Sequence, residues 1–317
     1  MLAVAPLAYA SQFNGPAQAQ EEAIPHPSAV TSLELPAPRA AELQRAMDAH
    51  DYLTAEKILL AEIDQEPHSP SAARMLAFAG TVYFLNHDYL NAAIAWKKSD
   101  AITPLAPNLR FSLAMTYIHI AHPDWARPVL ESLAQQNPEN ALFPYWLGRL
   151  EYDARRYKEA VHYFQHAIEL NPSMSRAYDN LGLCYFYDDQ NQLAIENYNK
   201  AIALDRSTLH PSPWPYLNLA VTQQFLGQLS AAETNLREAL RLDPSLVSAH
   251  FQLGSLLEDA GQLKEAVTEL QEAARLNPND PQPHVLMARI YHRLGQEKAA
   301  HDEADLYQRL RTAAAKP

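Results

Sequence analysis

Three side chains of this sequence have the spacing of a metal site. His162 and His166 stand four residues apart and Glu169 follows three residues later, so all three share one face of a predicted helix. Imidazole and carboxylate groups are zinc ligands, but three of them without supporting residues are more typical of an ordinary polar helix face. His119 and His122 are a weaker pair at the end of a predicted helix. We therefore expect no bound metal ion.

No catalytic motif accompanies these residues. The sequence contains no His-Glu-x-x-His, no Gly-rich phosphate loop and no Gly-x-Ser-x-Gly elbow. Its single cysteine, Cys184, excludes an intrachain disulfide and a multi-cysteine zinc site. The neighbouring Leu181 and Tyr185 favour a buried thiol over a nucleophile. The sequence thus predicts a protein that is not an enzyme and needs no cofactor.

The charge balance bears on the kind of partner. The chain has 317 residues, of which 48% are hydrophobic and 20% charged, and its formal net charge is −12. This acidic balance argues against binding to nucleic acid, which requires clustered Lys and Arg. It suggests a partner with some basic character. No apolar run is long enough to cross a membrane.

The first 35 residues differ from the rest. Residues 2–10 form a short apolar stretch, and Ala17 and Ala19 make a small-x-small site before a polar segment. This resembles a secretory signal, but the basic segment that should precede it is missing, since the first basic residue is Arg39. The sequence predicts either a signal peptide or a disordered Ala/Pro-rich leader over residues 1–35. The compartment, exported or periplasmic on one hand and cytoplasmic on the other, stays open.

The elements that must position any functional side chain follow a period of 34 residues. Pro104, Pro138 and Pro172 are 34 residues apart, and so are Pro244 and Pro278. The gap between the two series exceeds two periods by four residues, which correspond to the insertion 209–212. The resulting repeats are 36–69, 73–106, 107–140, 141–174, 175–208, 213–246, 247–280 and 281–314.

Small residues recur at fixed positions within this frame. Position 20 is alanine in all eight repeats, and glycines fall at position 8 or position 15. Position 15 suits a left-handed residue that ends a first helix, and position 8 suits a close approach of two helices. Each repeat therefore predicts two amphipathic helices of about a dozen residues. The proline at position 32 ends the second helix.

The repeated residues resemble the tetratricopeptide repeat (TPR) family. In repeat 175–208 they are Tyr178, Leu181, Gly182, Tyr185, Ala194, Tyr198 and Ala201, although Arg206 stands where the family has proline. The resemblance covers residues 36–314 and implies an all-α superhelical solenoid of about eight helix-turn-helix units. The charged segment 297–311 suits a terminal helix with a polar outer face.

The resemblance also implies a concave groove lined by the first helices, at positions 2, 5, 6, 9, 12 and 13. We expect a partner segment to contact side chains at these positions: Phe111, Tyr145, Arg149, Tyr152, Asn180, Phe186, Tyr187, Trp214, Asn218, Phe225 and Phe251. Aromatic groups are typical of protein interfaces, and we expect some of these to be exposed. The alternative is that they pack between neighbouring helices.

A specific ligand is harder to name. The carboxylate clamp known in the family requires Lys at position 5, where no repeat has it and one has Asp179. Asn180 and Asn218 share position 6 and could hydrogen-bond a peptide backbone. The expected function is a non-enzymatic protein–protein interaction scaffold, monomeric or weakly oligomeric. The alternatives are a targeting or regulatory subunit for a separate enzyme, such as a glycosyltransferase, and a self-assembling structural element.

Overall fold

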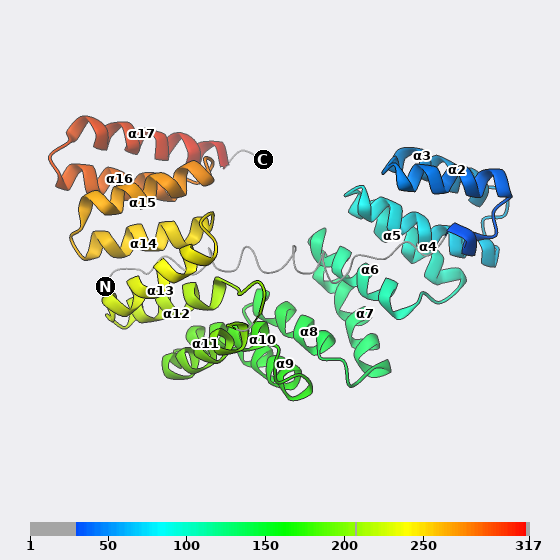
Figure 1. Ribbon diagram of the computed structural model, residues 1–317, viewed down its shortest axis with the longest axis horizontal. Coiled ribbons are helices and arrows are strands. Elements are labelled where there is room, and N and C mark those ends of the chain that lie inside the picture. Colours follow the sequence, from blue (N-terminus) through cyan, green and yellow to red (C-terminus); the bar gives the residue numbers. More distant parts are fainter. Residues whose placement is uncertain (1–29, 207, 315–317) are drawn as a thin grey trace. The chain divides into compact units, whose positions relative to one another are not determined.

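The computed structural model describes residues 30–206 and 208–314, and all of its regular elements are helical. The signal-peptide expectation falls on residues outside this range. A short 3-10 helix, η2 (Val30–Leu33), comes before sixteen α-helices in the described residues (Figure 1). Their bounds are α2 Ala37–Asp48, α3 Tyr52–Ile63, α4 Pro70–Leu85, α5 Tyr89–Ile102, α6 Pro107–His119, α7 Pro123–Gln136, α8 Leu142–Asp153, α9 Tyr157–Leu170, α10 Ser175–Tyr187, α11 Asn191–Asp205, α12 Trp214–Phe225, α13 Leu229–Leu242, α14 Val247–Asp259, α15 Leu263–Leu276, α16 Gln282–Arg293 and α17 Glu297–Ala314.

The helices form eight successive helix-turn-helix pairs, from α2–α3 to α16–α17. In the pairs other than α8–α9 the two helices pack on each other, as α4 packs on α5 and α10 on α11. Apart from the junction between α7 and α8, the second helix of one pair packs on the first helix of the next, as α11 does on α12. The prediction of an all-α repeat architecture is therefore confirmed.

The chain divides into two compact units, and the division falls inside α8. The described part of the N-terminal unit is 30–150, and that of the C-terminal unit is 151–314 without residue 207. Each unit is considered by itself below. No helix in either described part is both long and apolar enough to span a lipid bilayer.

Position 8 holds glycine because a second helix crosses there at close range. A Cβ atom on Gly80 would lie 2.5 Å from the indole of Trp96, and one on Gly182 would lie 2.6 Å from the ring of Tyr198. Contacts that short do not occur between real atoms, so a side chain would force the helices apart. The predicted role of position 8 is confirmed in these repeats.

Position 15 is left-handed in every repeat. Gly227, Gly261 and Gly295 have φ values of 75°, 79° and 70°, as the sequence predicts. The other five repeats adopt a positive φ with a residue that has a side chain: His50, His87, Ala121, Arg155 and Asp189. The turn between the two helices thus sets this backbone conformation, whatever residue occupies it.

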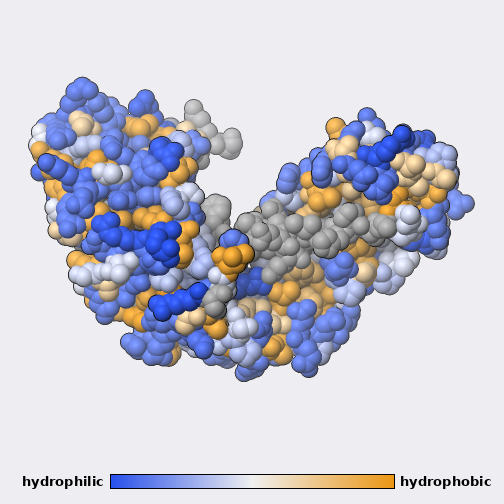
Figure 2. All heavy atoms as spheres, viewed as in Figure 1, coloured by the Kyte–Doolittle hydropathy of each residue, from blue (hydrophilic) through white to orange (hydrophobic). Residues whose placement is uncertain are grey.

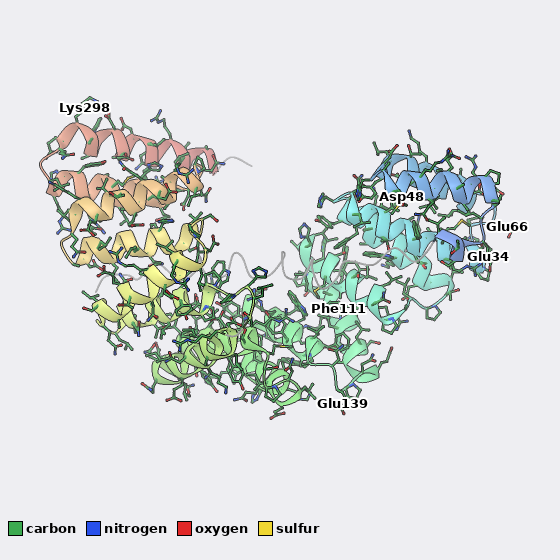
Figure 3. All side chains as sticks on the ribbon, in the orientation of Figure 1. Glu34, Asp48, Glu66, Phe111, Glu139 and Lys298 are labelled. Atoms are coloured by element: carbon green, nitrogen blue, oxygen red, sulfur yellow. The ribbon has the colours of Figure 1, made fainter. Side chains whose placement is uncertain are left out.

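Position 20 belongs to the core. Its alanine is completely buried in the first seven repeats: Ala55, Ala92, Ala126, Ala160, Ala194, Ala232 and Ala266. Ala300, in the last repeat, is half-buried. It lies on α17, the last described helix, which packs on α16. Figure 3 shows Lys298 on the outer side of α17, and this lysine pairs with Asp302 at 2.8 Å.

Candidate functional site

In the N-terminal unit the predicted groove residues are buried. The ring of Phe111, on α6, meets Phe143 edge-on with 6.0 Å between centroids. Tyr145 is completely buried and lies edge-on to Trp146 at 5.4 Å. The guanidinium-bearing side chain of Arg149 is only 5% exposed. The expectation that these three side chains are accessible is therefore corrected, because they pack among helices as core residues do.

Four of the predicted residues in the C-terminal unit are buried as well: Tyr152, Asn180, Asn218 and Phe251. Both amide groups donate hydrogen bonds within the protein. Asn180 Nδ2 donates to the carbonyl oxygen of Arg176 at 2.7 Å, and Asn218 Nδ2 donates to Asp179 Oδ1 at 2.9 Å. Buried amides need such partners. Neither amide NH₂ is therefore presented to an incoming peptide in this structure, and the expected accessibility is corrected here too.

The remaining four predicted residues reach the surface. Phe225, at the end of α12, is 48% exposed. Phe186 and Tyr187 at the end of α10, and Trp214 at the start of α12, are half-buried. They come from first helices of consecutive repeats, and α10 and α12 are in contact. An accessible aromatic surface therefore exists on the C-terminal unit, smaller than the sequence predicts.

Side chains from three repeats build this surface, which we call the aromatic row: Tyr157, Tyr187, Phe186 and Phe225. Tyr157 and Tyr187 stack in parallel planes, with centroids 4.7 Å apart and 7° between planes. Phe186 meets Tyr187 edge-on at 5.6 Å and Phe225 edge-on at 5.8 Å. Each geometry is one that aromatic pairs favour. The row is continuous and ends at its most exposed ring.

Tyr157 is the member that sequence reasoning missed. It begins α9, a second helix, whereas the groove was expected on first helices only. The signal for it was its place at position 17, two residues after the left-handed Arg155. A residue just after the turn lies at the same end of the repeat as the end of the first helix.

The aromatic row is neutral and has carboxylates beside it. Burial raises the pKa of Tyr187 to about 12, with the neighbouring Tyr157 contributing, so this hydroxyl stays protonated near neutral pH. The exposed Asp189 follows closely after Tyr187 in the chain. On the other side, Asp259 is exposed and accepts a hydrogen bond from Gln224, the neighbour of Phe225, at 3.2 Å. Arg155 also places a positive charge beside Tyr157 and Tyr187. The carboxylate of Asp259 beside the Phe225 end of the row favours basic residues in the part of a partner that reaches that end.

The side chains considered as metal ligands in the sequence make contacts only with nearby residues in the structure. His162, His166 and Glu169 are exposed, and His166 Nδ1 lies 3.4 Å from Glu169 Oε2. Among the described residues, no group of three or more His, Cys, Asp or Glu side chains is placed to hold a metal ion. His119 lies against the ring of Tyr89, with centroids 3.8 Å apart.

His122 and Cys184 also take part in side-chain packing. His122 stacks on Trp125 with 4.0 Å between ring centroids. Cys184 is completely buried, as the sequence indicates.

Known proteins resemble this chain over most of the repeats. Sequence models described as tetratricopeptide repeat match residues 111–175, 173–245, 226–290 and 257–311, which together exceed half of the chain. The Hsp70-Hsp90 organising protein of Plasmodium falciparum is 32% identical over 101 residues, which are 31% of this chain and 38% of that protein. The chain thus aligns with well under two thirds of the length of such relatives.

Solved structures agree on the fold. A tetratricopeptide repeat protein from Parabacteroides merdae has a TM-score of 0.65 at 17% identity, covering 83% of this chain and 98% of its own. The hetero-tetramer Cut9-Hcn1 of the APC/C includes a chain with a TM-score of 0.61 at 20% identity, covering 78% of this chain and 48% of that one. Together with the eight helix pairs and the sequence matches, these likenesses show that the chain belongs to the tetratricopeptide repeat family.

Proposed function

We propose that this protein is an interaction scaffold that binds a segment of a partner protein across the aromatic row of its C-terminal unit. The observation that carries the proposal is the row itself. It combines a half-exposed phenylalanine, Phe225, with rings that are already fixed by stacking. Side chains held in place before binding lose little conformational entropy when a partner arrives.

The partner segment that suits this surface is apolar with basic flanks. Its apolar side chain would cover Phe225, since aromatic anchors dominate interface energies. Its lysine or arginine residues would lie near Asp189 and Asp259, which are both exposed. This proposal assigns the partially basic partner suggested by the sequence to α10, α12 and α14.

Two relatives have names that refer to other proteins, which supports a role in protein binding. One is the organising protein of Hsp70 and Hsp90, and the other is part of the Cut9-Hcn1 hetero-tetramer. A regulatory subunit for a separate enzyme would use the same kind of surface. A self-assembling element is less favoured, because the outer residues of α17 include charged pairs such as Lys298 with Asp302.

The test is affinity capture with a matched pair of variants. The protein is immobilised and exposed to extract of its native organism, and bound proteins are quantified by mass spectrometry. We expect Phe225→Ala to lose the captured partner. Trp125→Ala is the control, because Trp125 is an equally accessible aromatic side chain, 50% exposed, in the other unit. Circular dichroism should show unchanged helicity in both variants. Retention of every partner by the Phe225 variant would contradict the proposal.

A further inference from the structure

The polar atoms within the aromatic row are two tyrosine hydroxyls, and both can donate a hydrogen bond to a ligand. Tyr157 is half-buried, and its hydroxyl makes no hydrogen bond to any residue in the described ranges. The hydroxyl oxygen of Tyr187 accepts a hydrogen bond from Tyr152, which leaves the proton of Tyr187 available. Burial raises the pKa of Tyr157 and of Tyr187, so both hydroxyls stay protonated near neutral pH. The row thus presents two donors among four aromatic rings.

A partner segment that covers the row must supply acceptors for these two donors. A covered hydroxyl loses its hydrogen bonds to water, and the loss is unfavourable unless the ligand replaces them. An α-helix is a poor source of acceptors, because its backbone carbonyl groups already accept hydrogen bonds within the helix. An ordinary extended segment has free carbonyl groups but also free N–H groups. For those N–H groups the row has only the hydroxyl oxygens as acceptors, and Tyr152 already occupies one of them.

Proline meets these requirements through both its backbone and its ring. It has no backbone N–H group, so it leaves no donor unpaired on a surface that has few acceptors. In the polyproline II conformation its carbonyl groups are free, because that helix has no internal hydrogen bonds. Grooves lined by aromatic side chains bind proline-rich segments in this way, and the ligand is already ordered before it binds. The chemistry of the row therefore matches a proline-rich segment better than a helix or a strand.

The length of the row agrees with one turn of such a segment. A polyproline II helix has three residues per turn and rises about 3.1 Å per residue, so one turn spans about 9 Å. The ring centroids of Tyr187 and Phe186 are 5.6 Å apart, and those of Phe186 and Phe225 are 5.8 Å apart. The direct distance from Tyr187 to Phe225 is no longer than these two steps together. Two prolines separated by one turn can therefore contact the rings of Tyr187 and Phe225.

We infer that the aromatic row binds a proline-rich segment in the polyproline II conformation. Prolines one turn apart would lie on Tyr187 and Phe225, and backbone carbonyl groups would accept hydrogen bonds from Tyr157 and Tyr187. The inference rests on the proposed function and names the class of its partner. A lysine or arginine next to the prolines would lie near Asp259 at the Phe225 end of the row. An oligosaccharide is a poorer match, because its many hydroxyl groups need more polar partners than two phenols provide.

Labelled peptides test the inference with the whole protein, and fluorescence anisotropy reports binding. The probe contains about four turns of Pro-Pro-Ala repeats between two lysines. In a second peptide alanine replaces every proline, and a third peptide is an amphipathic helix with leucines along one face. Both comparison peptides keep the two lysines, so the three peptides have the same charge. We expect the proline-rich peptide to bind and the other two not to bind.

Three variants locate the binding. Phe225→Ala should weaken the proline-rich peptide about tenfold or more, because it removes the most exposed ring of the row. Tyr157→Phe keeps the ring and removes one hydroxyl, so the affinity should fall about three- to tenfold, which is the equivalent of one hydrogen bond. Tyr163→Phe is the matched control, since Tyr163 is another half-buried tyrosine of α9 and lies outside the row. It should change the affinity less than about twofold. Thermal melting followed by circular dichroism confirms that each variant is folded.

Several outcomes would overturn the inference and leave the proposed function intact, provided that capture of a partner still depends on Phe225. One is that the proline-rich peptide does not bind. Others are that the alanine or leucine peptide binds as tightly, or that Tyr157→Phe leaves the affinity unchanged. Binding of cellohexaose that Phe225→Ala abolishes, without binding of the peptide, would replace the proline-rich segment with an oligosaccharide. The proposed function fails separately, when Phe225→Ala retains every captured partner.

Discussion

At the scale of single residues, the left-handed backbone conformation at position 15 destabilises the fold where the residue has a side chain. Five repeats have such a residue at this position, and three have glycine. An L-residue with a side chain loses roughly 1–2 kcal/mol in this conformation, whereas glycine does not. Ala121 has a φ of 60° and a side chain too short to make compensating contacts at a distance. It is therefore the clearest place to measure the cost.

We predict that Ala121→Gly raises the free energy of unfolding by about 0.5–1 kcal/mol, since relief of the strained backbone outweighs the added freedom of the unfolded chain. Gly261→Ala should lower it by about 1 kcal/mol. Nothing lies within 4 Å of a Cβ added at Gly261, so the loss would come from φ alone. Urea denaturation measures both. A neutral or destabilising Ala121→Gly would contradict the account.

At the scale of the helix pair, the last two repeats join their helices through a histidine and a glutamate. His250 Nδ1 lies 2.7 Å from Glu269 Oε2, and His284 Nδ1 lies 2.6 Å from Glu303 Oε2. His250 Nε2 also lies 3.0 Å from the carbonyl oxygen of Pro244. Both neighbours of the His250 ring are acceptors, so both ring nitrogens donate only when the imidazole is protonated.

This arrangement makes the stability of the α14–α15 pair depend on pH. Burial of the ring lowers the pKa of His250, but the hydrogen bonds to Glu269 and Pro244 and the charges of Glu269 and Glu272 raise it more. The net result is a folded pKa above the ordinary 6.5. Stabilisation from a raised pKa is complete below the unfolded value and disappears as the pH rises through the folded value.

We therefore predict that the free energy of unfolding decreases as the pH rises from below 6.5 through the raised pKa of His250. His250→Gln should reduce this decrease, and Glu269→Gln should do the same by removing the negative charge that favours the protonated imidazole. His162→Gln serves as control, since His162 is exposed on α9. Urea titrations at several pH values give the measurement. An unchanged pH dependence in His250→Gln would show that the ring is not held in its charged form.

The periodic part of each pair could be predicted from the sequence, but the exposure of the groove residues could not. Spacing alone identifies Gly182 as a close-approach position, because that role belongs to one residue within one repeat. Exposure depends on the neighbouring repeat. Tyr187 and Phe225 share position 13, yet Tyr187 is covered by Tyr157 of the preceding repeat. The corresponding place before Phe225 is Asn191, which leaves the ring 48% exposed.

At the scale of the whole molecule, contacts between elements are confined to neighbouring pairs within each unit. Glu258 illustrates such a link, since this buried carboxylate at the end of α14 pairs with Arg289 and Arg293 of the next first helix at 2.5 and 3.3 Å. The surface is mixed, with hydrophilic and hydrophobic side chains side by side on the face shown in Figure 2. Stability in such arrays is a sum of terms from single repeats and their interfaces, so damage in one repeat should stay local.

A cavity at the first repeat tests that expectation. Leu43 of α2 is completely buried, so Leu43→Ala should cost about 2–5 kcal/mol. The lost stability is that of the first repeats and their interface. Amide hydrogen exchange should therefore become faster in α2 to α4 and stay unchanged in α14 to α17. The mirror variant, Leu270→Ala in the fully buried core of α15, should produce the opposite pattern. Equal acceleration along the entire chain in either variant would instead mean that the repeats unfold as one cooperative body, and stability could then not be assigned repeat by repeat.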